Sequence, residues 1–81
     1  MLLLDDERIW MEDETGRTVA EITFPETAPG VYTIDHTFVD ESLRGQGVAS
    51  KLVSAAVEEI EKRGGRAEAT CSYAARWLAR R

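Results

Sequence analysis

The hydrophobic pattern of this chain changes its period once, and the change separates a strand-rich half from a helix-rich half. Between residues 8 and 39 the apolar residues stand in short runs rich in β-branched and aromatic side chains, which is typical of strands. From Gly47 to Ile60 they recur every three or four residues, which is the spacing of one buried helix face. A chain with this switch is predicted to fold in the α+β class.

Three strands are expected before the switch, over residues 8–12, 17–24 and 31–39. The first two are separated by a turn that ends in Gly16, a residue free to take positive φ. Two prolines and a glycine within residues 25–30 break the chain before the third. Because consecutive strands with short connections usually pair, we expect an antiparallel three-stranded meander.

The second half predicts a long helix, a short strand and a last helix. The long helix opens at Gly47 and ends before Gly64-Gly65, a strong stop signal. A short strand follows over residues 66–70, and Ser72 is expected to cap a helix over residues 73–81. The long helix then connects two strands of one sheet as a crossover, which predicts that these strands run parallel.

Length and composition favour one small domain, residues 1–81, in a reducing, cytoplasmic setting. No apolar run approaches the roughly 20 residues needed to span a bilayer, so no membrane association is expected. The apolar start of the chain runs at once into acidic residues, unlike a signal peptide. The single cysteine excludes a disulfide framework, and no Cys/His cluster has zinc spacing, so no metal is expected.

Charge is distributed unevenly along the chain. The net charge of −5 argues against a general nucleic-acid-binding protein, because contacts to phosphate dominate that affinity. Residues 1–41 contain eleven acidic residues and two arginines, whereas residues 42–81 contain four acidic and eight basic residues. The second half is therefore the expected place for an anionic ligand, although two solvated faces would give the same pattern.

The junction between the third strand and the long helix has the residues of an anion site. Arg44-Gly45-Gln46-Gly47-Val48-Ala49 follows a strand and opens an amphipathic helix. A helix start offers N–H groups without partners and the positive end of the helix dipole. Glycines at 45 and 47 leave no side chain to keep a diphosphate away from these groups. The segment lacks the lysine and length of a Walker loop and the GxGxxG pattern of dinucleotide-binding folds.

This segment resembles the acetyl-CoA motif Q/R-x-x-G-x-G/A of the GNAT (GCN5-related) N-acetyltransferase superfamily, which lies at the same strand-to-helix junction. Arg44, Gly47 and Ala49 match it position by position. The resemblance is closest to a small single-domain group with His-Thr on the preceding strand and Cys before the last helix, here His36-Thr37 and Cys71. It extends over nearly the whole chain, from about residue 8 to residue 78.

The resemblance implies acetyl-CoA as the cofactor and transfer of its acetyl group to an amine, in a small molecule or a peptide. It implies that the main-chain groups of Phe38 and Val39 bind the pantetheine arm and that residues 44–49 hold the pyrophosphate, mainly through N–H groups. The acetyl carbonyl would lie between two parallel strands that splay near His36 and Ala69-Thr70.

Three residues are candidates for the chemistry. His36 is a possible base, although period-two counting puts it on one face with Tyr32, Ile34 and Phe38, where a packed histidine is the alternative. Cys71 precedes a helix start, which can lower a thiol pKa, so it is a possible nucleophile or a buried apolar residue. Tyr73 is a possible acid for the departing thiolate or a packing aromatic residue.

The chain departs from larger members of the superfamily. It has no sequence for the two helices that usually follow the first strand, and the usual strand glutamate has no clear counterpart. An open acceptor pocket, or one completed by a partner, is therefore expected, with the chain a monomer or weak dimer. Two functions remain: an N-acetyltransferase, or a non-catalytic module that binds CoA or acyl-CoA.

Overall fold

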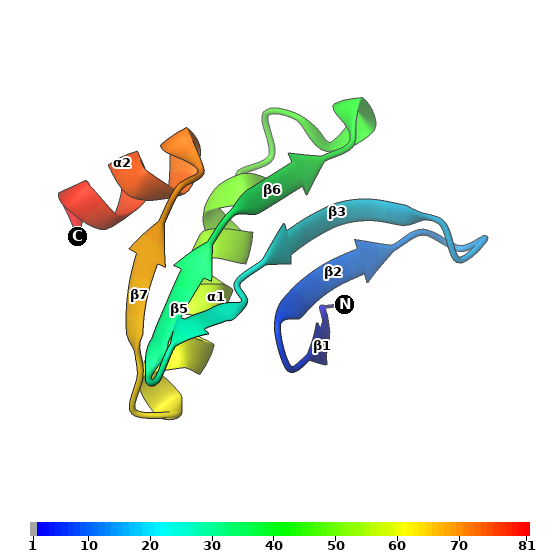
Figure 1. The fold of residues 1–81 in the computed structure, drawn as a ribbon. Helices are drawn as coiled ribbons and strands as arrows, with labels where there is room; N and C mark the ends of the chain where they lie inside the picture. Colours follow the sequence, from blue (N-terminus) through cyan, green and yellow to red (C-terminus); the bar gives the residue numbers. More distant parts are fainter. Residues whose placement is uncertain (1) are drawn as a thin grey trace.

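The structure, a computed structural model, describes residues 2–81 and confirms the α+β class. Three elements were not predicted, because each has three residues and is too short to show a hydrophobic period. In chain order the elements are β1 (Leu3–Asp5), β2 (Arg8–Glu12), β3 (Thr18–Thr23), β4 (Glu26–Ala28), β5 (Val31–Ile34), β6 (His36–Val39), the 3-10 helix η1 (Glu41–Leu43), α1 (Val48–Lys62), β7 (Arg66–Ala69) and α2 (Ser72–Arg80) (Figure 1).

The strands form two sheets, and the stretch predicted as one third strand belongs to both. β6 pairs antiparallel with β3 in a sheet of order β1-β2-β3-β6, so the predicted meander is present with β1 added. β5 instead lies in the sheet β4-β5-β7, where it runs parallel to β7 as predicted. The strand divides at Asp35, whose N–H donates to the carbonyl of Thr23 at 3.3 Å.

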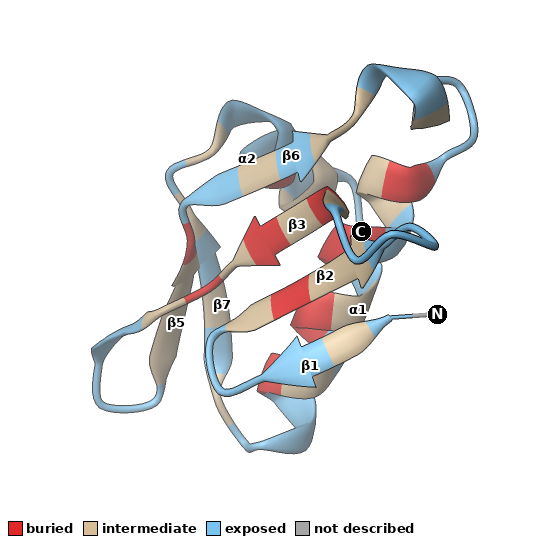
Figure 2. Ribbon diagram, turned by 90° about the vertical axis from the view of Figure 1, so that its right-hand side faces the viewer, coloured by how far each residue is buried: buried red, intermediate tan, exposed pale blue. Residues whose placement is uncertain are grey.

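The core lies between α1 and the two sheets (Figures 1 and 2). α1 presents the apolar stripe expected from its spacing, and this stripe is buried against β2 and β3 (Figure 2). The buried helix residues are Val48, Leu52, Val53, Ala56, Val57 and Ile60. Opposite them, Ile22, Phe24 and Ile34 are fully buried on the strands and on the β3–β4 connection. This packing fixes the start of α1 against the end of β6.

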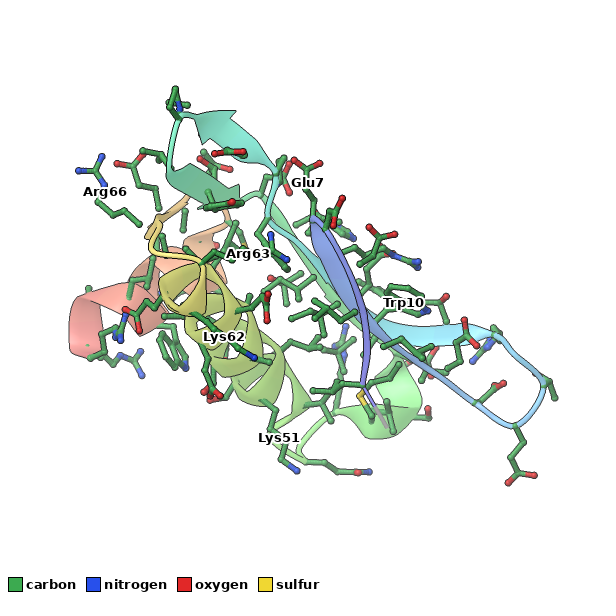
Figure 3. The ribbon with its side chains drawn as sticks, turned by 90° about the horizontal axis from the view of Figure 1, so that it is seen from below. Glu7, Trp10, Lys51, Lys62, Arg63 and Arg66 are labelled. Carbon is green, nitrogen blue, oxygen red and sulfur yellow. The ribbon has the colours of Figure 1, made fainter. Side chains whose placement is uncertain are left out.

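The C-terminal end of α1 is closed by the glycines that predicted it. Gly64 has φ of 77°, the N–H of Gly65 donates to the Ile60 carbonyl at 2.9 Å, and that of Gly64 to the Glu61 carbonyl at 2.9 Å. This is a Schellman motif, whose left-handed residue favours glycine. Arg63 extends from this end toward the β1–β2 turn, where its guanidinium donates to the Asp6 carbonyl at 2.6 Å (Figure 3).

α2 begins one residue earlier than predicted. Cys71 is its N-cap residue, without a side-chain cap, so the prediction that Ser72 caps this helix is wrong. The Cys71 carbonyl accepts the N–H of Ala75 at 2.9 Å, which opens the helix. Ala74 is buried, and Trp77 and Leu78 are half-buried against the core. None of the helices within residues 2–81 combines the length and apolar character needed to cross a membrane.

Candidate functional site

A groove of about 410 Å³ lies between the end of β6, the start of α1 and the first turn of α2. It contains most of the predicted cofactor-binding residues, but Gln46 and Phe38 are not among its walls. The lining residues are Thr37, Val39, Leu43, Arg44, Gly45, Gly47, Val48, Ala49, Ser50 and Tyr73.

The loop that enters the groove is held by Asp40 at the end of β6. Its carboxylate accepts the N–H of Ser42 at 3.0 Å and the Ser42 hydroxyl at 2.6 Å, which caps η1. Arg17 from the β2–β3 hairpin donates to the same carboxylate at 3.2 Å. Hydrogen bonds from Ser42 and, to a smaller extent, the charge of Arg17 hold the Asp40 pKa below its usual value. The carboxylate is therefore ionised at neutral pH and holds the loop that leads to Arg44 and Gly45.

Two glycines complete this loop in conformations that other residues rarely adopt. Gly45 has φ of 82° and Gly47, the N-cap of α1, has φ of 72°. A Cβ atom built at either position would meet no atom within 4 Å. Glycine is therefore required by the backbone rather than by crowding, and the space in front of both residues is open.

The first turn of α1 presents main-chain donors to this space. The first hydrogen bond of the helix runs from the N–H of Lys51 to the Gly47 carbonyl at 3.1 Å. Val48, Ala49 and Ser50 have N–H groups with no acceptor within the part of the chain that the structure describes, and Gly47 offers no side-chain cap. Together with Arg44 on the groove wall, these groups form an anion-binding cradle.

The groove wall formed by Thr37 and Val39 of β6 lies where the two sheets separate. β6 is the last strand of one sheet and β7 of the other, and no pairing joins them. The β5–β7 pair ends where the Ile34 carbonyl accepts the N–H groups of Thr70 at 3.0 Å and Cys71 at 3.3 Å. The predicted splay between β6 and β7 therefore begins directly after Ile34.

Cys71 lies at the mouth of this gap, half-buried. Its Sγ is 3.7 Å from Oγ1 of Thr37, a wall of the groove, although Cys71 itself does not line the groove. Partial burial acts to raise the pKa of the thiol, and the charge of Asp35 adds to this effect. The N–H groups of Ala74 and Tyr73 and the Thr37 hydroxyl outweigh both, so the Cys71 pKa is lower than usual.

His36 and Phe38 occupy the opposite face of β6. The His36 side chain is 55% exposed, and its Nε2 lies 3.5 Å from Oε1 of Glu21 on β3. The predicted apolar face shared with Tyr32 and Ile34 is not present, because the chain changes sheets at Asp35 and period-two counting does not continue across that break. Thr37 and Val39, rather than His36 and Phe38, face the groove.

Comparisons with known proteins agree with this arrangement. The model of the GCN5-related N-acetyltransferase family matches residues 8–81. The chain belongs to this family. It also superimposes on the solution structure of a GCN5-like protein from Staphylococcus aureus, with 31% identity and a TM-score of 0.80, over 99% of this chain and 78% of that one.

Two longer acetyltransferase structures share the same fold. A protein from Agrobacterium tumefaciens is 32% identical with a TM-score of 0.64, over 80% of this chain but 44% of its own length. An acetyltransferase from Bacillus cereus, 24% identical with a TM-score of 0.65, shares the fold over 79% of this chain and 51% of its own. Both solved structures are thus considerably longer. A comparison with curated proteins found no match.

Three residues at the groove were not assigned a role from the sequence. Thr37 was noted only as part of the His-Thr pair, because its contact with Cys71 depends on the division of the strand at Asp35. Leu43 and Ser50 also line the groove. Ser50 could have been found from the sequence, because it lies in the first turn of the predicted long helix, where the N–H groups have no partner within the helix.

Proposed function

We propose that this chain binds acetyl-CoA in the groove and transfers the acetyl group to an amine. The proposal rests on one observation: a single groove contains both the uncapped start of α1 and Thr37, and the Thr37 hydroxyl contacts the Cys71 thiol, whose pKa is lowered. The main-chain N–H groups of residues 48–50 and the Arg44 guanidinium would bind the pyrophosphate. Gly45 and Gly47 would admit it, since both leave open space in front of the backbone.

The free edge of β6 would hold the pantetheine arm. The N–H of Asp40 donates to the Val19 carbonyl at 2.7 Å, and hydrogen-bonded pairs alternate along an antiparallel ladder. By this alternation the main-chain groups of Phe38 point toward β3, and those of Thr37 and Val39 point toward the gap. We therefore assign pantetheine recognition to Val39, as the resemblance implied, and to Thr37 in place of Phe38.

Cys71 and Tyr73 would carry the chemistry at the mouth of the gap. Acetyl-CoA supplies an acetyl group activated as a thioester. In the covalent route, the Cys71 thiolate forms a bond to the acetyl carbon, the carbon–sulfur bond of the thioester breaks, and CoA leaves as a thiolate that takes a proton. A neutral amine then displaces the acetyl group from Cys71, regenerating its thiolate and losing a proton to solvent. In the direct route a neutral amine bonds to the acetyl carbon and the carbon–sulfur bond of the thioester breaks. The Tyr73 hydroxyl protonates the departing thiolate, and the proton that the nitrogen loses passes to solvent, from which Tyr73 is protonated again.

The amine would approach from the uncovered side of β6. Glu21 and His36 lie on that face of the sheet, and Asp35 lies at the break between β5 and β6. The Glu21 carboxylate is already paired with Arg8, so the Asp35 carboxylate is the acidic group that favours a protonated amine at the entrance; the amine must lose a proton before it attacks. No role at the reacting carbon is assigned to His36, which the fold places on the face away from the groove.

Two measurements on the full chain test the proposal. Calorimetric titration should show CoA binding at a ratio of one, and no binding at millimolar CoA would refute it. Release of free CoA thiol from acetyl-CoA should accelerate when primary amines are added, with acetylated amine found by mass spectrometry. Binding of CoA without any acetyl transfer across a varied amine panel would leave the domain a binding module and contradict the catalytic part.

A further inference from the structure

We propose that the face of α2 carrying Trp77, Arg76 and Arg80 binds the 3′-phosphoadenosine end of CoA, so that the chain discriminates CoA from its 3′-dephosphorylated form. This inference rests on the CoA binding proposed above and assigns a site for the part of the molecule that the cradle does not hold. Two hollows lie along α2, bordered by these arginines and by Trp77.

The hollows adjoin the cradle groove through shared residues. One is lined by Ser50, Tyr73, Trp77, Arg80 and Arg81, and Ser50 and Tyr73 are also walls of the cradle groove. The other, on the neighbouring side of α2, is lined by Tyr73, Arg76, Trp77 and Arg80. A ligand whose diphosphate lies at the first turn of α1 can therefore continue along α2 without leaving the surface.

The charge of this surface suits a phosphate. Residues 72–81 contain no acidic residue and three arginines. Arg81 is already engaged, since its guanidinium donates to the two Glu61 carboxylate oxygens at 2.7 and 3.1 Å. Arg76 and Arg80 form no ion pair with any carboxylate in residues 2–81. Two guanidinium groups without carboxylate partners thus border the same hollow, and guanidinium binds phosphate through paired hydrogen bonds.

The aromatic residue between these arginines is held in place. Trp77 is half-buried, and its Nε1 donates to the Ser50 hydroxyl at 3.2 Å, which ties α2 to the first turn of α1. The Arg81 guanidinium lies 6.0 Å from the centre of its ring. A fixed indole beside arginines that have no carboxylate partner is the combination that stacks on a base and pairs with its phosphate; the one hydrogen bond of the Arg76 side chain within residues 2–81 is a 3.5 Å contact from Nε to the Ser72 carbonyl. Adenosine 3′-phosphate, joined to the diphosphate of CoA, has both groups in the required order.

The test compares CoA, 3′-dephospho-CoA and adenosine 3′,5′-bisphosphate by titration of the full chain. Wild-type protein should bind CoA roughly tenfold more tightly than dephospho-CoA, as expected for about one charge-assisted hydrogen bond to the extra phosphate. The bisphosphate should compete with CoA, and the preference should decrease at high salt. Arg80→Gln and Arg76→Gln should each reduce the preference with little effect on dephospho-CoA, and Trp77→Phe should weaken both ligands.

Lys62→Gln is the matched control, because Lys62 is the last residue of α1, at the end opposite the cradle. It removes one positive charge and should leave the preference for CoA over dephospho-CoA unchanged. If Lys62→Gln lost as much of this preference as the arginine variants do, the effect would come from net charge alone and the assignment would be overturned. Equal binding of CoA and dephospho-CoA by wild-type protein would also overturn it, while CoA binding itself would stand. Failure of both ligands to bind would instead refute the proposed function. Melting curves for each variant separate loss of binding from loss of fold.

Discussion

The Sγ atom of Cys71 lies 3.7 Å from Oγ1 of Thr37, across the gap that opens between β6 and the start of α2. The two residues are far apart in the sequence, Thr37 on β6 and Cys71 at the N-cap of α2, so this contact depends on the whole fold. It places a thiol of lowered pKa against a wall of the cradle groove. The reactive end of the proposed site is therefore defined by this pair.

Cys71 should react with iodoacetamide faster at neutral pH than a free thiol does. Its lowered pKa increases the fraction present as thiolate, the form that reacts. The midpoint of the alkylation rate against pH should lie below that of an unstructured cysteine peptide. Bound CoA should slow the reaction, because the thioester end of the ligand would cover the thiol. A midpoint equal to that of the peptide would contradict the hydrogen-bonded environment described above.

Thr37→Val should make Cys71 less reactive by removing one hydrogen bond to the thiolate. A net hydrogen bond contributes about 1 kcal/mol, so the neutral-pH rate should fall by up to roughly fivefold, with the pH midpoint moved upward. Thr27→Val is the control, because the Thr27 hydroxyl pairs instead with that of Thr33 at 2.8 Å. If both variants alkylate alike, the Thr37 contact does not tune the thiol.

Gly47→Ala should weaken CoA binding more than it weakens the fold. The left-handed backbone at Gly47 costs an L-residue about 1–2 kcal/mol, and the new methyl group enters the space in front of the cradle. Gly16→Ala carries a similar backbone penalty, at φ of 86° in the β2–β3 hairpin, with open space around it. Both variants should melt a few degrees earlier, but only Gly47→Ala should lose CoA affinity. Similar affinity losses in both would place the anion site elsewhere.

Asp40→Asn should reduce CoA affinity through the loop rather than through direct contact. Asp40 accepts two hydrogen bonds from Ser42, as Asp13 accepts two from Thr15 at 2.9 and 2.7 Å. Asp13→Asn is therefore a control that disturbs an equivalent turn in the β2–β3 hairpin; it shares the Arg17 contact with Asp40 but leaves both Ser42 hydrogen bonds in place. We expect both variants to lower the melting temperature, and Asp40→Asn alone to weaken CoA binding. Equal affinities in the two variants would show that η1 does not organise the cradle.

The same two carboxylates give the fold a predictable acid dependence. Hydrogen bonds from Thr15 and Ser42 are the main causes that lower the pKa values of Asp13 and Asp40 below their usual 3.8. A lowered folded-state pKa adds stability that is fully present above the unfolded-state value and is lost as pH falls through the folded-state value. Wild-type protein should therefore melt at lower temperatures below about pH 4, and each Asn variant should show a smaller change there.

Much of this fold could be predicted from local patterns. The apolar stripe of α1, the glycine pair that ends it and the parallel relation of β5 and β7 each follow from spacing or from handedness rules. The position of the cradle could also be predicted from the sequence, because a strand, two glycines and a helix start follow one another directly along the chain. These features depend on residues that are close in the sequence, where physical constraints are strongest.

The placement of side chains around Asp35 could not be predicted in the same way. Residues 31–39 have continuous strand propensity, and nothing local shows that β5 and β6 pair with different partners. That choice reversed the expected surroundings of His36 and moved Thr37 to the groove. Similarly, the cap of α2 shifted by one residue, because the Cys71 N–H is held by the end of β5, which local sequence does not reveal.

Cys71 variants should separate the covalent route from direct attack. With acetyl-CoA and no amine, a covalent route leaves an acetyl group on the wild-type protein, visible as a mass increase that Cys71→Ala abolishes. Cys71→Ala should then lose acetyl transfer while retaining CoA affinity, because the cradle donors are main-chain groups of α1. Cys71→Ser nearly preserves the size of the side chain and should restore any packing contribution but not the transfer, since a hydroxyl is a far weaker nucleophile. An unmodified wild-type protein, together with an active Cys71→Ala variant, would exclude the covalent route. Tyr73→Phe should then be the variant that slows transfer, because the direct route depends on protonation of the departing thiolate.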